Sequence, residues 1–275
     1  MNEPNHIRRI AVLTIVTSLI ATPLVIWVLG PHLPPGKASG QAAAQVTDNT
    51  VLTAVMTPII CLILCYFGYA LVVFRRRGSG IEEGVAIRGD ARTQTLWIAA
   101  TSTIVLFLAG YGTWALLKTG SGGGQGPSPI AVPKGPSLAV QVIGQQWQFT
   151  YRYPSYGGLE TSQLVLPANR LIEFHVTSLD AIHSFWAYNL GVKADANPNV
   201  DNVVYANTRG PRSFNIQCAE LCGLWHGYMY DKGKVVSSAE FASWIGQQQQ
   251  IFQPIARYMP AYSTTYNPDP TRRAG

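Results

Sequence analysis

The chain has 275 residues, which is enough for one large domain or two smaller ones. Only 12% of the residues are charged, whereas the apolar fraction of 47% is ordinary, and both averages conceal a sharp division along the sequence. The net charge of +6 does not indicate nucleic-acid binding, because residues 1–119 hold nine Lys/Arg against five Asp/Glu and residues 120–275 hold eleven against nine.

Three long stretches without a charged residue lie in the first half of the chain, at residues 10–29, 51–74 and 96–117. Each reaches the roughly 20 residues that an α-helix needs to cross the hydrocarbon core of a bilayer. The second and third stretches are therefore predicted to be membrane spans, which form a helical hairpin over residues 51–118. The lipid bilayer is accordingly an expected partner.

The first apolar stretch, residues 10–29, has two interpretations. Arg8 and Arg9 before it also fit a signal peptide, whose hydrophobic region is typically about 7–15 residues long. This stretch is longer, and no Ala-x-Ala cleavage site follows it directly. We favour a retained anchor followed by an exported loop, which together make up residues 1–50, and the sequence leaves a cleaved signal open.

The distribution of arginines sets the orientation of these segments, because short cytoplasmic loops carry an excess of Lys and Arg. Five arginines lie between the second and third apolar stretches: Arg75, Arg76, Arg77, Arg88 and Arg92. That loop is predicted to be cytoplasmic, so everything after residue 117 lies outside the cytoplasm. The sequence predicts a multi-pass protein of the plasma membrane with an extracytoplasmic C-terminal domain.

The C-terminal half has the pattern of an all-β domain that follows a Gly/Pro/Ser-rich linker at residues 119–137. Short runs rich in Val, Ile, Phe, Tyr and Trp predict strands at 138–144, 146–153, 162–168, 171–178, 183–188, 201–207 and 212–218, and a further strand is predicted at 233–236. Closely spaced strands without intervening helices favour a β-sandwich or barrel, here over residues 138–252. A short helix is predicted at 238–247 and an extended tail at 253–275.

The segment from Cys218 to Met229 holds two thiols, an imidazole and a thioether within twelve residues. Cys, His and Met are the ligands of electron-transfer copper sites. A single blue-copper site needs only one Cys, so Cys218 and Cys222 together indicate that both thiolates converge on a pair of metal ions. His226 completes this cluster, and His183, between two predicted strands, is a candidate for a further ligand.

A disulfide between Cys218 and Cys222 is the main alternative, because the domain is predicted to lie in an oxidising compartment. Such a bridge would close a very small loop and stabilise the fold little, and it would leave His226 and Met229 without a role. Zinc is a weaker candidate, since a thioether is a poor zinc ligand.

Two other groups of metal-ligating residues are predicted to be structural. His175 lies in the polar register of an alternating strand, which favours a solvated or hydrogen-bonded side chain over a ligand. Cys61 and Cys65 lie within an apolar span, where a free Cys packs as a small hydrophobic residue.

The segments DAIHSFWAYNLGVKADANP (180–198) and CAELCGLWHGYM (218–229) closely resemble the dinuclear copper (CuA) domain of subunit II of haem-copper cytochrome c oxidases. The resemblance extends over residues 50–250. It implies N-terminal transmembrane α-helices, two or three in number, followed by a cupredoxin-like β-sandwich or barrel. It also implies a ligand set, in which Cys218 and Cys222 bridge both coppers.

The remaining roles follow from the same resemblance. His183 and Met229 would complete one copper, and His226 with the backbone carbonyl of Glu220 would complete the other. The Glu220 side chain would help to hold a Mg²⁺ or Mn²⁺ ion at the boundary with subunit I. Trp147 corresponds to the exposed Trp through which cytochrome c passes its electron.

The resemblance implies a subunit that accepts electrons from cytochrome c, or another c-type donor, and passes them to haem in subunit I. There oxygen would be reduced to water with proton translocation, in a complex with further oxidase subunits. The sequence leaves open the CuA subunit of a nitric oxide reductase and a freestanding membrane-anchored copper carrier. No Cys-x-x-Cys-His motif is present, so no haem is expected in this chain.

Three features depart from the family pattern. The aromatic strip after Trp147 is thinner, since Gln148 and Phe149 follow it. Gln94, three residues before Trp97, stands where the family often has a Glu at a proton-uptake entrance, and Gln cannot relay a proton. The C-terminal half is nearly neutral, whereas the family's docking face for a basic cytochrome c is acidic, so electrostatic steering is expected to be weak.

Overall fold

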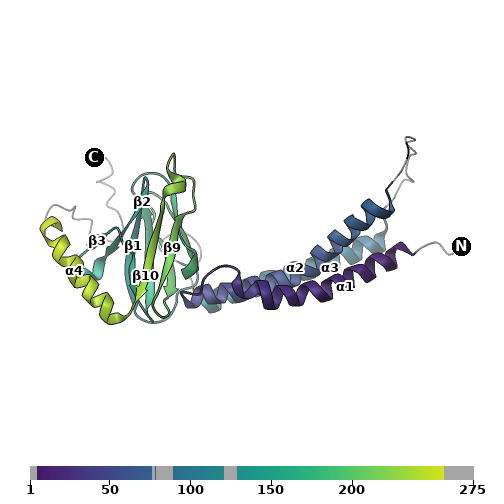
Figure 1. Ribbon diagram of the computed structural model, residues 1–275, viewed down its shortest axis with the longest axis horizontal. Coiled ribbons are helices and arrows are strands. Elements are labelled where there is room, and N and C mark those ends of the chain that lie inside the picture. The colour runs from purple at the N-terminus through teal and green to yellow at the C-terminus, as the bar shows by residue number, and fades with distance from the viewer. Residues whose placement is uncertain (1–4, 76–77, 79–88, 121–128, 257–275) are drawn as a thin grey trace. The chain divides into compact units, whose positions relative to one another are not determined.

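The computed structural model describes residues 5–75, 78, 89–120 and 129–256 (Figure 1). Three of the arginines used to orient the chain, Arg76, Arg77 and Arg88, lie outside the described residues, as do parts of the predicted linker and tail. The chain forms two compact units. One comprises Met1–Leu33 and Thr47–Ala115, and the other comprises Pro34–Val46 and Leu116–Gly275.

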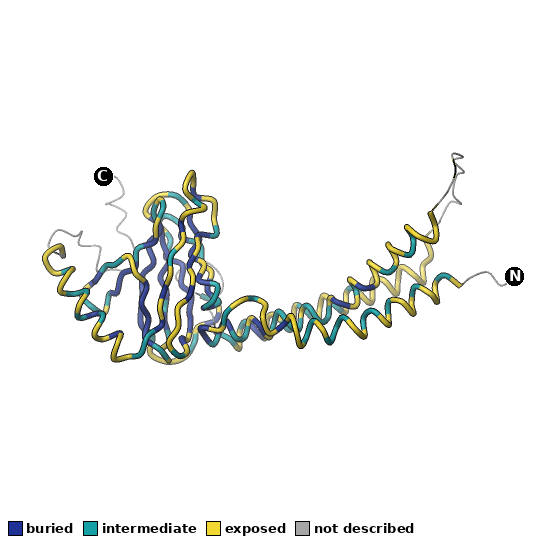
Figure 2. The backbone as a smooth tube through the Cα atoms, in the orientation of Figure 1, coloured by how far each residue is buried: buried dark blue, intermediate teal, exposed yellow. Residues whose placement is uncertain are grey.

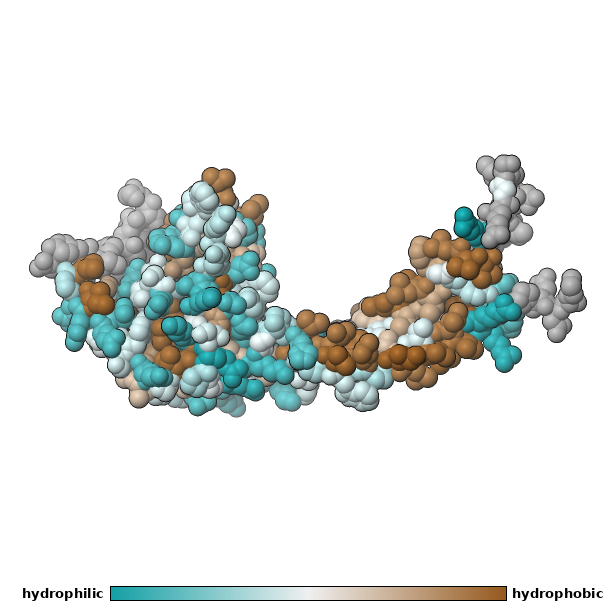
Figure 3. Space-filling model, in the orientation of Figure 1, coloured by the Kyte–Doolittle hydropathy of each residue, from teal (hydrophilic) through white to brown (hydrophobic). Residues whose placement is uncertain are grey.

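The first unit is helical, and its helices are long and apolar enough to cross a membrane. α1 (His6–Leu24) continues through η1 (Val25–Leu29) and η2 (Gly30–His32), and it is followed by α2 (Gly40–Val73) and α3 (Ala91–Thr119). The most apolar windows of the three spans have mean hydropathies of 2.3, 2.2 and 1.5. Large apolar side chains cover their surfaces (Figure 3), which is the pattern of helices solvated by lipid.

α2 begins earlier than the sequence predicted. The exported loop was expected to reach residue 50, but the helix begins at Gly40. Residues 41–45, Gln-Ala-Ala-Ala-Gln, have high helix propensity. The hydroxyl of Ser39 accepts a hydrogen bond from the Ala42 N–H at 2.9 Å and so satisfies a free donor of the first turn. Cys61 and Cys65 lie on α2 and are unbridged.

The second unit is built around a sandwich of two five-stranded sheets, in the orders β3-β2-β1-β5-β8 and β4-β10-β9-β6-β7. Their bounds are β1 (Ser137–Gln145), β2 (Gln148–Tyr153), β3 (Leu159–Thr161), β4 (Val165–Pro167), β5 (Leu171–Ser178), β6 (His183–Ala187), β7 (Val192–Ala196), β8 (Asn202–Asn207), β9 (Arg212–Cys218) and β10 (Tyr230–Val236). The predicted fold class, apolar helices followed by a β-sandwich, is confirmed. Neither β3 nor β7 was predicted, because β3 has three residues and β7 alternates with charged ones.

The core lies between the two sheets, where the buried positions of the strands concentrate (Figure 2). β1 and β5 pair in parallel, which places Val140 beside Phe174 and Val142 beside Val176. These four side chains have no solvent exposure. Each contributes about 1.5–3 kcal/mol through burial, so the sandwich has a rigid interior from which loops project.

α4 (Ser238–Ala256) follows β10 and is longer than the predicted helix at 238–247. Residues 253–256 were expected to begin the extended tail, but they belong to this helix. The Gln-rich run after residue 246 favours helix, and Pro254 falls within the last turn. Ser237 caps the helix: its hydroxyl accepts from the Glu240 N–H at 3.2 Å, and the Glu240 carboxylate accepts from the Ser237 N–H at 2.9 Å.

Replacing Ser237 by Ala should loosen the first turn of α4. Loss of a serine N-cap typically costs about 1 kcal/mol, so we expect amide hydrogen exchange in this turn to accelerate about fivefold in the full-length chain. Ser238→Ala is the matched control, since its exposed side chain has no capping bond. Equal exchange rates in the two variants, measured by mass spectrometry, would contradict the capping role.

Candidate metal centre

Two neighbouring strands of the second sheet bring the predicted ligands to one end of the sandwich. β9 ends at Cys218, and residues 219–229 connect it to β10. β6 begins at His183 and pairs antiparallel with β9, where Phe185 lies opposite Cys218. Side chains two residues apart on a strand share a face, so this pairing places His183 beside Cys218.

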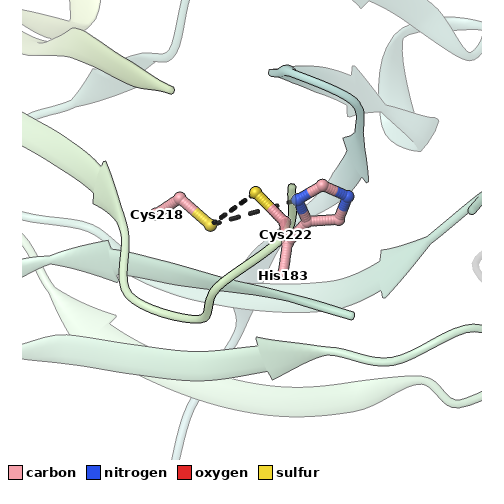
Figure 4. A group of neighbouring side chains, drawn as sticks. All are labelled: His183, Cys218 and Cys222. Carbon is pink, nitrogen blue, oxygen red and sulfur yellow. Dashed lines mark hydrogen bonds between the residues drawn. The ribbon is translucent and has the colours of Figure 1, made fainter. Parts of the chain in front are cut away.

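His183, Cys218 and Cys222 form a buried group that could hold a metal ion, and their ligand atoms all lie within 4.8 Å of one another. The Cys218 Sγ lies 3.8 Å from the Cys222 Sγ and 3.9 Å from the His183 Nδ1 (Figure 4). Sulfurs bound about 2.3 Å from one metal at near-tetrahedral angles would have this separation. The two thiols are not bonded to each other, so the structure contains no disulfide here.

The other predicted donors surround the same two sulfurs. The Cys222 Sγ lies 3.5 Å from the His226 Nδ1 and 3.8 Å from the Met229 Sδ. The backbone carbonyl oxygen of Glu220 lies 3.3 Å from the Cys218 Sγ. Met229 is buried and His226 is half-buried. Thiolate, imidazole and thioether donors in a largely buried cluster match the preferences of copper.

The conformation of the ligand loop depends on contacts with the turn between β1 and β2. The Gln146 side chain donates a hydrogen bond to the Cys222 carbonyl at 2.9 Å, and the Trp147 indole N–H donates to the same oxygen at 3.2 Å. Gly223 has a φ of +116°, and a Cβ there would lie 3.0 Å from the Gln146 Nε2. Only glycine therefore fits this turn without strain.

Asp180 orients the imidazole of His183. Its carboxylate lies 2.8 Å from the His183 Nε2, which leaves the Nδ1 facing the thiols. Burial of Asp180 opposes its ionisation, but hydrogen bonds from His183 and the Gln146 backbone outweigh that effect and lower the pKa of the Asp180 carboxyl. Burial likewise opposes the charged imidazole, yet the bonds to Cys218 and Asp180 raise the pKa of His183. A carboxylate behind a ligating histidine is a common support of metal sites.

The thiols of Cys218 and Cys222 differ in how readily they ionise. Burial disfavours a thiolate at Cys218, but hydrogen bonding to His183 prevails and lowers the pKa of Cys218. Burial and the negative charge of Cys218 raise the pKa of Cys222. Without a metal, the pair therefore holds one negative charge more readily than two. Binding of a cation at both sulfurs would release the second proton.

Two predicted residues lie apart from the ligand atoms. The Glu220 side chain is exposed, so only its backbone carbonyl faces the sulfurs. His175 is outside the cluster, as predicted: it is buried in β5 with its Nδ1 2.8 Å from an Asp201 carboxylate oxygen. The contact of Gln146 with the loop was not predicted, because a glutamine side chain reaching a distant carbonyl leaves no sequence pattern.

Replacing Asp180 by Asn should lower the pKa of His183 in the metal-free protein, because the carboxylate that favours the imidazolium is lost. The ion pair of Asp180 with His183 stabilises the metal-free fold within a window of pH. Its contribution to stability is lost as pH rises through the raised pKa of His183, and it is also lost as pH falls through the lowered pKa of Asp180. NMR titration of the imidazole measures the change. Asp195→Asn is the control, and an unchanged His183 titration in Asp180→Asn would contradict the assigned role.

Comparison with known proteins finds similarity to oxidase subunits. The family model for the periplasmic domain of cytochrome c oxidase subunit II matches residues 159–236. Cytochrome c oxidase subunit 2 of Thermostichus vulcanus is 26% identical over 66% of this chain and 68% of its own length. Subunit 2 of Synechocystis sp. is 24% identical over 94% of this chain and 89% of its own length.

A solved structure shows the same likeness. The periplasmic domain of subunit II of cytochrome oxidase (CoxB) of Bradyrhizobium japonicum is 33% identical, with 44% of this chain matching 98% of that domain at a TM-score of 0.42. The match to the probable subunit 2 of Rickettsia bellii, at 30% identity, spans about half of that protein's length. Residues 159–236 therefore match the periplasmic domain of cytochrome c oxidase subunit II, and most of the chain is similar to subunit 2 of Synechocystis sp..

Proposed function

We propose that this chain accepts electrons at a dinuclear copper (CuA) centre and passes them to haem in subunit I of a membrane-bound haem-copper oxidase. Its donor would be cytochrome c or another c-type protein. Oxygen would be reduced to water in subunit I, with proton translocation. The observation that carries the proposal is the pair of buried thiols 3.8 Å apart, with one imidazole nitrogen beside each.

The number of donors favours two coppers over one. The site offers six donor groups, which exceeds the four that a single soft metal ion commonly binds. If both thiolates bridge two ions, each ion has two sulfurs and needs two further donors. His183 with Met229 would complete one copper, and His226 with the Glu220 carbonyl would complete the other. A copper pair held by these residues would supply one-electron transfer, with the charge shared between the two ions.

Trp147 is the proposed point at which electrons enter. The side chain is half-buried, and its indole N–H bonds directly to the carbonyl of a proposed bridging cysteine, Cys222. The ligand loop also exposes apolar side chains, with Leu221 79% and Leu224 84% accessible. Since the C-terminal half is nearly neutral, we propose that the donor docks through apolar contacts more than through charge.

The Glu220 carboxylate is proposed to serve a partner subunit. Its backbone carbonyl faces Cys218 while its side chain points into solvent, so one residue presents oxygens to two different sites. An exposed carboxylate suits a hard cation such as Mg²⁺ or Mn²⁺, which prefers oxygen ligands. A shared cation at this point would link the copper loop to subunit I. Gln94 cannot relay protons, so this role is either absent from the chain or supplied by subunit I.

The proposed location is the plasma membrane, with the copper domain on the extracytoplasmic side. The three apolar helices support membrane insertion, and Arg75 and Arg92 flank the same predicted cytoplasmic loop. Both sulfurs of the metal centre then lie in an oxidising compartment, where they must stay reduced until copper binds.

Metal analysis of the purified chain should find two coppers per chain. Cys218→Ser and Cys222→Ser should each reduce the content to one or none, because each removes a proposed bridge. Cys61→Ser and Cys65→Ser are matched controls, since these thiols lie on α2 in the helical unit and are not among the proposed ligands. One copper in the unaltered chain would contradict the dinuclear proposal.

Trp147→Phe should slow electron transfer from a c-type cytochrome by more than about tenfold, because the indole bond to the Cys222 carbonyl is lost. The copper content of the variant should not change. Stopped-flow measurement of copper reduction gives the rate of electron transfer. Trp186→Phe is the control, since its partly exposed ring on β6 makes no such bond. Equal slowing by the two variants would rule out a special role for Trp147.

A further inference from the structure

The N-terminal end of α1 carries an open groove that the copper chemistry does not use. The groove encloses about 580 Å³. Its lining residues come from the start of α1 and from the last turns of α2: Asn5, Arg8, Arg9, Val12, Leu13 and Tyr69. All of them belong to the helical unit, so the groove lies within one compact body.

One half of the groove is strongly basic. Arg8 and Arg9 are both exposed, and neither forms an ion pair with a carboxylate of the described residues. A guanidinium group binds phosphate through two parallel hydrogen bonds, which makes arginine a preferred phosphate ligand. Two such groups on the wall of one groove offer several donors to one anion.

The other half of the groove is apolar. Val12 and Leu13 are 52% and 46% exposed, and apolar side chains continue along α1 beyond them. The space-filling view shows a hydrophilic patch that adjoins this apolar surface near the N-terminus (Figure 3). A ligand that satisfies both halves must carry a negative head and a long apolar tail.

The wall of the groove is held by contacts between α1 and α2. The His6 Nδ1 lies 2.8 Å from the Tyr69 hydroxyl. The ring of His6 also packs edge-on against Tyr69 and Phe74, with centroids 5.8 and 5.1 Å apart. These contacts hold the side chain of Tyr69 in place on the wall of the groove.

We propose that this groove binds one phospholipid with an anionic headgroup from the cytoplasmic leaflet. Arg8 and Arg9 hold the phosphate, and the first acyl carbons lie on Val12 and Leu13. Basic pockets between transmembrane helices on the cytoplasmic side recognise such headgroups. The site is independent of the copper centre, so either proposal can fail without the other.

Native mass spectrometry of the delipidated full-length chain, titrated with phosphatidylglycerol or phosphatidylcholine, tests the proposal. We expect the first phosphatidylglycerol to bind at least about tenfold more tightly than phosphatidylcholine, and Arg8→Gln/Arg9→Gln to abolish this preference. Arg92→Gln is the matched control, because this exposed arginine of α3 lies outside the groove. A preference that survives in the double variant would overturn the proposal.

Leu13→Trp separates a built site from diffuse attraction to the membrane surface. This variant fills the apolar half of the groove and keeps both arginines, so it should also abolish the preference. Full preference in Leu13→Trp would overturn the proposal, and so would displacement of the lipid by millimolar inorganic phosphate. If the intact mass of the purified chain shows that α1 has been removed, the proposal is overturned as well, since the groove would then be absent from the mature chain.

Discussion

The metal centre depends on one interaction, the antiparallel pairing of β6 with β9. It joins two segments more than thirty residues apart, and it is anchored where Phe185 lies opposite Cys218. The backbone bond from the Ala219 N–H to the Ser184 carbonyl, at 2.9 Å, continues the pairing into the ligand loop. Without it, the loop would contain both thiols but would lack the buried imidazole of His183.

Three loops at that end of the sandwich support one another. Gln146, in the turn between β1 and β2, connects to both of the others. Its backbone N–H donates to the Asp180 carboxylate at 2.7 Å, and its side chain donates to the Cys222 carbonyl. Asp180 in turn holds His183. The ligand geometry is therefore fixed by hydrogen bonds before a metal binds. A preformed site is what rapid electron transfer requires, since little rearrangement accompanies the change in redox state.

The sequence predicted the parts of the molecule that follow from periodicity and spacing. Uncharged stretches predicted the three apolar helices, strand alternation predicted the sandwich, and the interval from Cys218 to Met229 predicted a group of donors that lie together in the structure. The early start of α2 and the length of α4 were missed, because polar helix formers such as Gln carry no hydropathy signal. The role of Gln146 was also missed, since a contact across seventy-six residues depends on tertiary packing alone.

The central claim is that Cys218 and Cys222 together bridge two coppers. Electron paramagnetic resonance of the copper-loaded chain, with one electron fewer than the fully reduced state, tests it most directly. The account predicts a hyperfine pattern from one unpaired electron shared equally by two copper nuclei. A pattern from a single copper nucleus, with a second copper absent or silent, would contradict it.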